Sequence, residues 1–291
     1  MPDAPTTPPE HAVRTARWTT LAAVAALALA ACAPTDDAGS SDDATDGALS
    51  TVKDGVLTIA TSDPAYEPWV VDNDPSSGKG FESAVAYAVA DELGFDEDHV
   101  EWTVASFDQI IAPGAKDFDV AINQVSISDE RKANLDFSSP YYTTTQAVVT
   151  LEGSAGAAAT TLADLKGLKI GAMVGTTSLT AAQDTIDPTT PVSPFNDNDQ
   201  VKQALTAGLV DAIVVDLPTA LYITAAELDG GILLGQLPDS AGGDEFGLVL
   251  DKGSALTGPV TDAVDALRED GTLGDLEAEW LTDAAGAPVL Q

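Results

Sequence analysis

Three polar features of the sequence could bind a small charged molecule. Arg131 closes the segment 126–131, which follows the end of a predicted strand. A guanidinium can hold a carboxylate through two parallel hydrogen bonds, so Arg131 could bind the acid group of a ligand. The alternative is an ordinary surface ion pair with Asp129 or Glu130 beside it.

The second feature is a glycine turn, and the third is a single aspartate. Gly175 is followed by Thr176, Thr177 and Ser178, between a predicted strand and the start of a helix. Backbone N–H groups and the helix dipole make such a turn an anion site, unless the hydroxyls only cap the helix. Asp216 closes another predicted strand, where it could bind an ammonium group or only cap the next helix.

Aromatic side chains also stand at predicted strand-to-helix connections. Tyr66, Trp69 and Phe107 could wall an apolar pocket, or they could belong to the core. In open α/β sheets, ligands bind outside the carboxyl ends of strands, where the polar features also fall. Together these residues indicate a receptor for a zwitterion, in which the arginine and the glycine turn bind an α-carboxylate and the aspartate binds an α-ammonium.

The elements that must position these residues alternate between strand and helix. Alternating or continuous apolar runs predict strands, and apolar residues three and four apart predict helices. This alternation predicts parallel sheets covered on both faces, and the length suits two of them. We expect strands at 56–61, 100–104, 118–122, 147–151, 168–174, 212–215 and 246–250, and helices at 81–93, 178–184, 199–208, 217–228, 259–270 and 273–281, with a short helix capped by Ser106 and Gln109.

The start of the chain predicts export and lipid attachment. Two arginines precede an apolar run at 21–31, which is too short to span a membrane and is typical of a secretory signal. The residues ending at Cys32 resemble the bacterial lipobox, in which the cysteine is lipidated and becomes the mature N-terminus. The alternative is a buried free cysteine in an ordinary secreted protein. We expect a signal peptide over residues 1–31 and a disordered tether over 32–50.

Composition excludes several classes of function. The formal net charge is −35 with only 12 Lys and Arg, so binding to nucleic acid is not expected. Only two histidines exist and His11 leaves with the signal peptide, so we expect no metal site and no cofactor. No Gly-x-Ser-x-Gly elbow is present, and no catalytic residue is assigned.

A series of motifs follows in a definite order along the chain. In sequence letters they are DPAYEP at 63–68, GFE at 80–82, the run 118–131, LDFSSPYY at 135–142, LADLKG at 162–167, the glycine turn and the segment 211–216. This order resembles the polar amino-acid-binding lipoproteins of bacterial ABC importers, solute-binding protein family 3. The similarity extends from about residue 57 to residue 280.

The resemblance implies an α/β architecture, the two-lobed periplasmic-binding-protein-like fold of type II, with two hinge crossings near residues 142–146 and 241–245. Lobe 1 would comprise residues 51–143 and 245–291, and lobe 2 residues 144–244.

The resemblance also implies a role for each site residue. Arg131 would bind the ligand carboxylate, helped by Ser126 and the hydroxyls after Gly175, and Asp216 would bind the amino group. The residues implied to line the side-chain pocket are Asp63, Tyr66, Phe107, Asn123, Gln124 and Met173, with Trp69 and Glu67 as candidates for specificity.

The expected protein is therefore a monomeric, lipid-anchored receptor on the outer face of the cytoplasmic membrane. It would bind a free polar or charged amino acid and deliver it to an ABC permease, without chemistry. Two alternatives remain open at this stage. One is an enzyme on the same scaffold, similar to cyclohexadienyl dehydratase, and the other is a ligand sensor that transports nothing.

Overall fold

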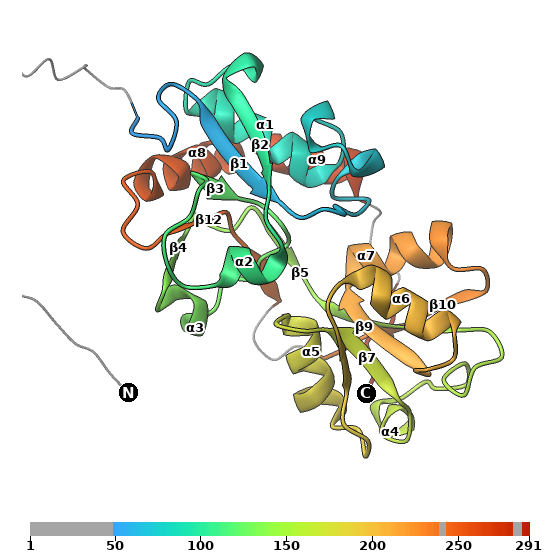
Figure 1. Ribbon diagram of the computed structural model, residues 1–291. Helices are drawn as coiled ribbons and strands as arrows, with labels where there is room; N and C mark the ends of the chain where they lie inside the picture. The colour runs from blue at the N-terminus through green and yellow to red at the C-terminus, as the bar shows by residue number, and fades with distance from the viewer. Residues whose placement is uncertain (1–48, 239–242, 282–286) are drawn as a thin grey trace, which may run out of the picture. The chain divides into compact units, whose positions relative to one another are not determined.

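A computed structural model describes residues 49–238, 243–281 and 287–291. Within these ranges no helix is long and apolar enough to cross a membrane. Cys32, the signal peptide and almost all of the expected tether lie outside the described residues. The described chain forms two α/β lobes, each built on its own five-stranded sheet (Figure 1).

The first lobe is built on a mixed sheet with the strand order β2-β1-β3-β12-β4. Strands β1 to β3 are parallel, whereas β12 runs antiparallel to both of its neighbours. The strands are β1 (Leu57–Thr61), β2 (Val100–Val104), β3 (Val120–Ala121), β4 (Leu135–Phe137) and β12 (Val249–Asp251). The helices are α1 (Phe81–Glu92), α2 (Phe107–Ile111), α3 (Asp129–Lys132), α8 (Thr257–Glu269) and α9 (Thr272–Trp280), with single 3-10 turns at Val71–Asn73, Pro75–Ser77 and Glu97–His99.

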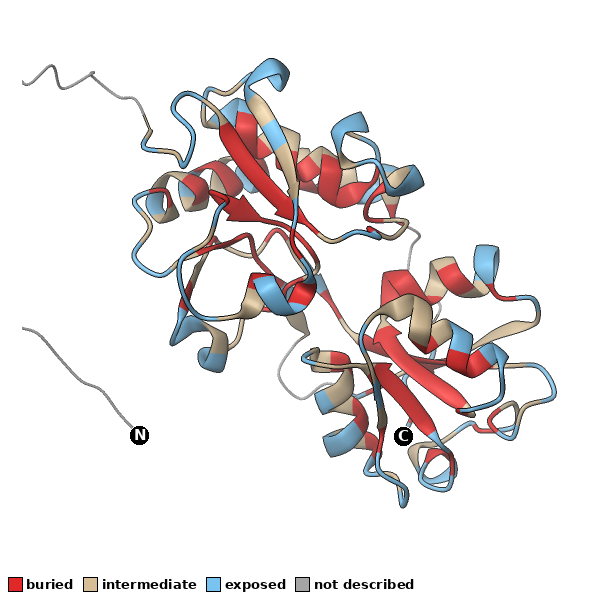
Figure 2. Ribbon diagram, in the orientation of Figure 1, coloured by how far each residue is buried: buried red, intermediate tan, exposed pale blue. Residues whose placement is uncertain are grey.

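The central strands β1 and β3 are buried on both faces of this sheet, since successive side chains of a strand point to opposite faces and each face is covered. Leu57 and Ile59 pack with α1, α8 and α9 in one apolar cluster. Ala60, their neighbour on β1, packs on the other face with Phe107 and Ile110 of α2. Figure 2 shows β1 buried along its whole length, whereas the edge strand β2 is half-buried or exposed.

The second lobe repeats this arrangement with the strand order β10-β6-β9-β7-β8. Val148 and Ile170 face a cluster that includes Leu165 of α4, and Val149 and Ile213 face the opposite cluster with α6 and α7. The strands are β6 (Gln146–Leu151), β7 (Ile170–Met173), β8 (Ser193–Phe195), β9 (Ala212–Asp216) and β10 (Gly231–Gln236). The helices are α4 (Leu162–Leu165), α5 (Thr177–Ala181), α6 (Asn198–Thr206) and α7 (Leu217–Tyr222), and π-helical turns at Ala182–Ile186 and Ile223–Glu227 extend α5 and α7.

A two-stranded ribbon connects the lobes. The chain leaves the first sheet through β5 (Tyr142–Thr144) and returns from the second through β11 (Asp244–Phe246). These strands pair antiparallel, with Tyr142 opposite Phe246. They fall at the two predicted crossings, although residues 241 and 242 lie outside the described part of the chain.

The end of the chain lies on the second lobe, not on the first as expected for all of 245–291. Val289 forms a parallel bridge with Gln236, and Leu290 is buried in a second-lobe cluster. The expectation is wrong for these last residues, because the edge strand β10 accepts another segment. Gly235 permits this approach, since a Cβ there would lie 2.5 Å from the carbonyl oxygen of Pro288.

The expectation of parallel sheets is right only in part, because each sheet also contains antiparallel pairs. In the second lobe β6 runs antiparallel to both β9 and β10. Both sheets are mixed because each ribbon strand delivers the chain to its sheet in the reverse direction. The apolar segment predicted as one strand at 246–250 is divided between β11 and β12.

Candidate functional site

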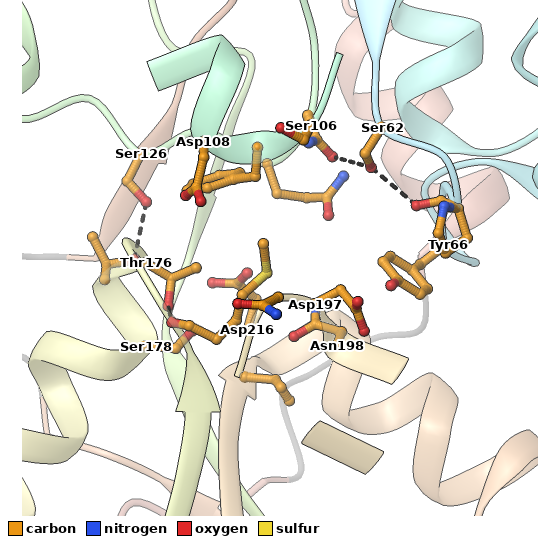
Figure 3. A pocket seen from close by; sticks show the side chains of 18 of the residues that line it. Ser62, Tyr66, Ser106, Asp108, Ser126, Thr176, Ser178, Asp197, Asn198 and Asp216 are labelled. Carbon is orange, nitrogen blue, oxygen red and sulfur yellow. Dashed lines mark hydrogen bonds between the residues drawn. The ribbon is translucent and has the colours of Figure 1, made fainter. Parts of the chain in front are cut away.

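A cavity of about 360 Å³ is lined by residues of both lobes (Figure 3). Polar side chains dominate its wall. Its lining residues are Ser62, Asp63, Pro64, Tyr66, Ser106, Phe107, Asp108, Asn123, Gln124, Ser126, Arg131, Met173, Thr176, Thr177, Ser178, Asn196, Asp197, Asn198, Val215 and Asp216.

Arg131 lies on the first-lobe side of this cavity, on the short helix α3 that Ser128 caps. Its guanidinium donates to the carbonyl oxygen of Ser126 at 2.5 Å and, across the lobes, to that of Gly175 at 3.0 Å. It lies 5.5 Å from the centre of the Phe107 ring. Burial lowers the pKa of Arg131, opposed chiefly by the nearby carboxylate of Asp244.

Arg131 therefore has a different environment from that of a surface arginine. Among the described residues it forms no ion pair with Asp129 or Glu130, which decides against the surface alternative. Its two hydrogen-bond acceptors are neutral carbonyl groups, which orient the guanidinium without neutralising it. A half-buried cation held in this way can receive an anionic group from the cavity.

The turn after Gly175 combines the two roles considered from the sequence. Thr176 caps α5 by accepting from the N–H of Leu179 at 3.2 Å, so its hydroxyl serves the helix. Thr177 instead reaches the first lobe, where its hydroxyl lies 3.1 Å from that of Ser126. Ser178 is buried and also lines the cavity. The turn thus brings hydroxyl groups beside Ser126, the residue whose carbonyl oxygen accepts from Arg131; Figure 3 shows Ser126, Thr176 and Ser178 on the same side of the cavity.

Asp216 ends β9 on the second-lobe side. It stands at the N-cap position of α7, yet its side chain makes no capping hydrogen bond, so the alternative of a simple cap is wrong. Its carboxylate accepts instead from Nε2 of Gln146 at 2.7 Å, and the same nitrogen donates to Asp244 at 2.7 Å. Burial, reinforced by the Asp244 carboxylate, raises the pKa of Asp216 to about 7. A cation entering the cavity would stabilise the ionised form.

The remaining predicted pocket residues also line the cavity, and several are already oriented. Asp63 accepts from the amide of Asn73 at 2.9 Å, and Asn123 accepts from Ser62 at 3.2 Å. The hydroxyl of Tyr66 is buried and has no hydrogen-bond partner among the described residues. This end of the cavity therefore offers carboxylate and amide oxygen atoms to a ligand.

Gln124 is held from behind by a buried carboxyl group. It adopts the left-handed backbone conformation with φ 47°, and its N–H donates to Oε1 of Glu82 at 2.6 Å. Its side-chain amide and the hydroxyl of Tyr141 also donate to Glu82. Burial raises the pKa of Glu82 to about 7, although these hydrogen bonds lower it. Glu82 thus orients a pocket residue without lining the pocket itself.

Trp69 does not line the cavity, which corrects its predicted place in the site. The side chain is completely buried in the first-lobe core, because the loop that carries Tyr66 turns inward after it. Glu67 also lies outside this lining.

Sequence reasoning missed part of the wall. Ser62, Pro64, Ser106, Asp108, Asn196, Asp197, Asn198 and Val215 line the cavity without having been predicted. The signal for 196–198 was present, because Asp197 caps α6 directly after strand β8 and accepts from Gln200 at 2.7 Å. That strand contains a proline and was not recognised. Within the described ranges, no group of three or more metal-ligating side chains could hold a metal ion.

Comparison with known proteins identifies relatives over most of the chain. Residues 57–283 match the model of the bacterial extracellular solute-binding proteins, family 3. The L-cystine-binding protein TcyJ of Escherichia coli (strain K12) is 32% identical over 242 residues, which cover 81% of this chain and 87% of that protein. The structure of an ancestral arginine-binding protein bound to arginine is similar with a TM-score of 0.66 and 30% identity, over 78% of this chain and 99% of that one. An ancestral amino-acid-binding protein described as a precursor of cyclohexadienyl dehydratase has a TM-score of 0.64 and 26% identity, over 78% and 96% of the two chains.

Proposed function

The chain belongs to the bacterial extracellular solute-binding proteins of family 3, and from this premise we propose that it binds a free amino acid between its two lobes. One observation carries the proposal. Arg131 of the first lobe and Asp216 of the second line the same cavity, so a cation and an acid are available to opposite ends of one small zwitterion. Relatives named as cystine- and arginine-binding proteins support the ligand class.

The proposed orientation follows from the charges of the wall. The α-carboxylate would accept from Arg131, with the hydroxyls of Ser126 and Thr177 beside it. The α-ammonium would donate to Asp216. A dissociation constant near 1 μM requires about 8 kcal/mol, and a charged hydrogen bond contributes about 1.5–3 kcal/mol. A few such bonds, with the apolar contact of Phe107, are enough after the cost of ordering.

The wall around the ligand side chain supports a polar or charged amino acid. Amides, hydroxyls and the carboxylates of Asp63 and Asp197 line it. An aliphatic side chain would leave these groups without hydrogen-bond partners, which is costly once water is expelled. We expect the protein to prefer side chains that donate hydrogen bonds.

We propose binding and release without a chemical step. The relatives named as binding proteins support this role. A structural neighbour described as a precursor of a dehydratase is the reason to test the enzyme alternative. Incubation with the bound amino acid or with prephenate-like acids, followed by chromatography, should return each compound unchanged. A new product formed at a catalytic rate would overturn this part of the proposal.

The proposed cellular role is delivery of the ligand to an ABC permease by a monomer held on the outer face of the membrane. Lipidation of Cys32 would supply the anchor, since two acyl chains suffice for stable attachment. Replacing Cys32→Ser should release the protein from the membrane fraction. A variant that stays membrane-bound would contradict the anchor, and normal uptake in a deletion strain would favour the sensor alternative over transport.

The direct test of binding is calorimetry of the purified protein with a panel of amino acids. We expect at least one polar or charged member to bind, and Arg131→Ala to weaken it on the order of 10²–10⁴-fold, as expected for two charged hydrogen bonds. The matched control is Arg268→Ala on α8, whose guanidinium pairs with Asp265 outside the cavity. Equal affinity in the two variants would refute the assignment of Arg131.

A further inference from the structure

Trp69 occupies the point where the first-lobe core meets both strands of the interlobe ribbon. Its ring packs edge-to-face against Tyr142 of β5 and Phe246 of β11, with centroids 5.7 Å apart in each case. Phe81, at the start of α1, completes the cluster at 6.0 Å. Trp69 therefore contacts the two segments through which the chain passes between the lobes.

The polar atom of the same side chain is bonded to the other lobe. Nε1 of Trp69 donates to the hydroxyl of Thr219 on α7 at 2.9 Å, and both side chains are buried. A buried indole N–H normally finds a partner, and this one lies 150 residues away in the chain. If the lobes separated here, both groups would lose this bond.

Each partner is adjacent to a wall of the ligand cavity. Thr219 lies in the first turn of α7, three residues after Asp216. On the other side, the backbone N–H of Trp69 donates to the carbonyl oxygen of Tyr66 at 3.0 Å, which closes the loop that carries the Tyr66 ring. One tryptophan thus connects the segment carrying Tyr66 to the helix that follows Asp216.

We propose that Trp69 is a positioning residue for ligand binding, whose hydrogen bond to Thr219 holds the two walls of the cavity at the spacing that the ligand requires. The inference rests on the proposed function, because it needs a ligand between the lobes. Trp69 acts through the segments it connects and does not touch the ligand. Removing its bond should therefore lower affinity although no cavity-lining residue is changed.

The chain provides a matched control for a purely structural role. Nε1 of Trp102 also donates to a hydroxyl, that of Tyr87 at 3.2 Å, and their rings also meet edge-to-face. Both residues of this pair belong to the first lobe. If these tryptophan hydrogen bonds mattered only for the stability of a lobe, removing either one would have the same effect on ligand affinity.

The decisive variants change Thr219, which leaves the aromatic cluster intact. Thr219→Val keeps the shape of the side chain but removes the hydroxyl, and Thr219→Ser keeps the hydroxyl. With an amino acid that binds the wild type in calorimetry, we expect Thr219→Val to bind roughly 2- to 13-fold more weakly, the loss expected for one hydrogen bond. Thr219→Ser should retain most of the affinity.

Fluorescence provides a readout that lobe stability alone would not change. Addition of the ligand should change the tryptophan emission of the wild type. Trp69→Phe should abolish this change, and Trp102→Phe should preserve it. Thr219→Val should need a higher ligand concentration for half-saturation. Its tryptophan emission should also change differently on ligand binding, because the indole has lost its hydrogen-bond partner.

The outcomes separate the two proposals. If no amino acid binds to the wild type, the proposed function fails and this inference with it. If the wild type binds but Thr219→Val has the same affinity and the same emission change, the proposed function stands and Trp69 is only a core residue. Equal losses in Thr219→Val and Thr219→Ser would also overturn the inference, because the hydroxyl would not be responsible.

Discussion

Ligand affinity should depend on pH near neutrality through Asp216. Burial and the carboxylate of Asp244 raise its pKa to about 7 in the unliganded protein. A ligand ammonium binds the ionised form, so the apparent affinity follows the ionised fraction, about 10% at pH 6 and about 90% at pH 8. We therefore predict that affinity rises about tenfold from pH 6 to pH 8.

The assay is calorimetry at several pH values with a ligand that has no group titrating between pH 6 and 8. Asp216→Asn is the control, because an asparagine keeps an acceptor for the Gln146 amide but cannot titrate. Its affinity should be low and should change less with pH. Affinity that is flat from pH 6 to 8 in the wild type, or an equal slope in Asp216→Asn, would refute the role assigned to this carboxyl group.

The raised pKa of Asp216 also affects folding stability, which should fall as pH rises, whereas ligand affinity should rise. A carboxyl group whose pKa is raised on folding, here from 3.8 to about 7, favours the folded state at low pH, and this contribution is lost as pH rises through about 7. The unliganded wild type should therefore lose more thermal stability than Asp216→Asn between pH 5 and pH 8. An identical decline in the two proteins would mean that Asp216 is not perturbed.

Two further predictions concern the framework of the site. Glu82→Gln places an N–H donor where three donors now converge on a carboxylate. It should lower the free energy of unfolding by about 1–3 kcal/mol in urea denaturation, and it should weaken ligand binding because Gln124 is no longer held. Wild-type values for both quantities would contradict the positioning role of Glu82. Gly80→Ala should destabilise the folded protein far more than Gly94→Ala. Both glycines have positive φ, but only at Gly80 would a Cβ lie 2.5 Å from a backbone carbonyl oxygen. Equal shifts in melting temperature would show that backbone conformation alone matters.

The central strands could be predicted from sequence because their residues are apolar on both faces. Strands β1 and β9 each differ from their predictions by one residue, and the edge strand β2, whose sequence alternates instead, matches its predicted range. The edge strands β8 and β10 were missed, since one contains proline and the other contains glycine at both a terminal and an internal position. The longer helices were recognised, but the four-residue helices α3 and α4 were not, and periodicity does not reveal that α5 and α7 continue as π-helical turns.

The site could be predicted where a residue type occurs at the end of a strand. Arg131 and Asp216 were predicted in this way, because strand ends of an α/β sheet meet at one edge, and both line the cavity. Trp69 shows the limit of this reasoning. It belongs to an irregular loop, in which no repeating pattern predicts which side chains face inward. Its direction is determined by packing against Tyr142 and Phe246, which are far away in the sequence.

A crystal structure of the protein with the amino acid selected by calorimetry would test the central claim most directly. The account predicts a carboxylate about 2.7–2.9 Å from the guanidinium of Arg131 and an ammonium group at a similar distance from Asp216 in the same ligand. A ligand bound outside this cavity, or one whose charged ends contact neither residue, would contradict it.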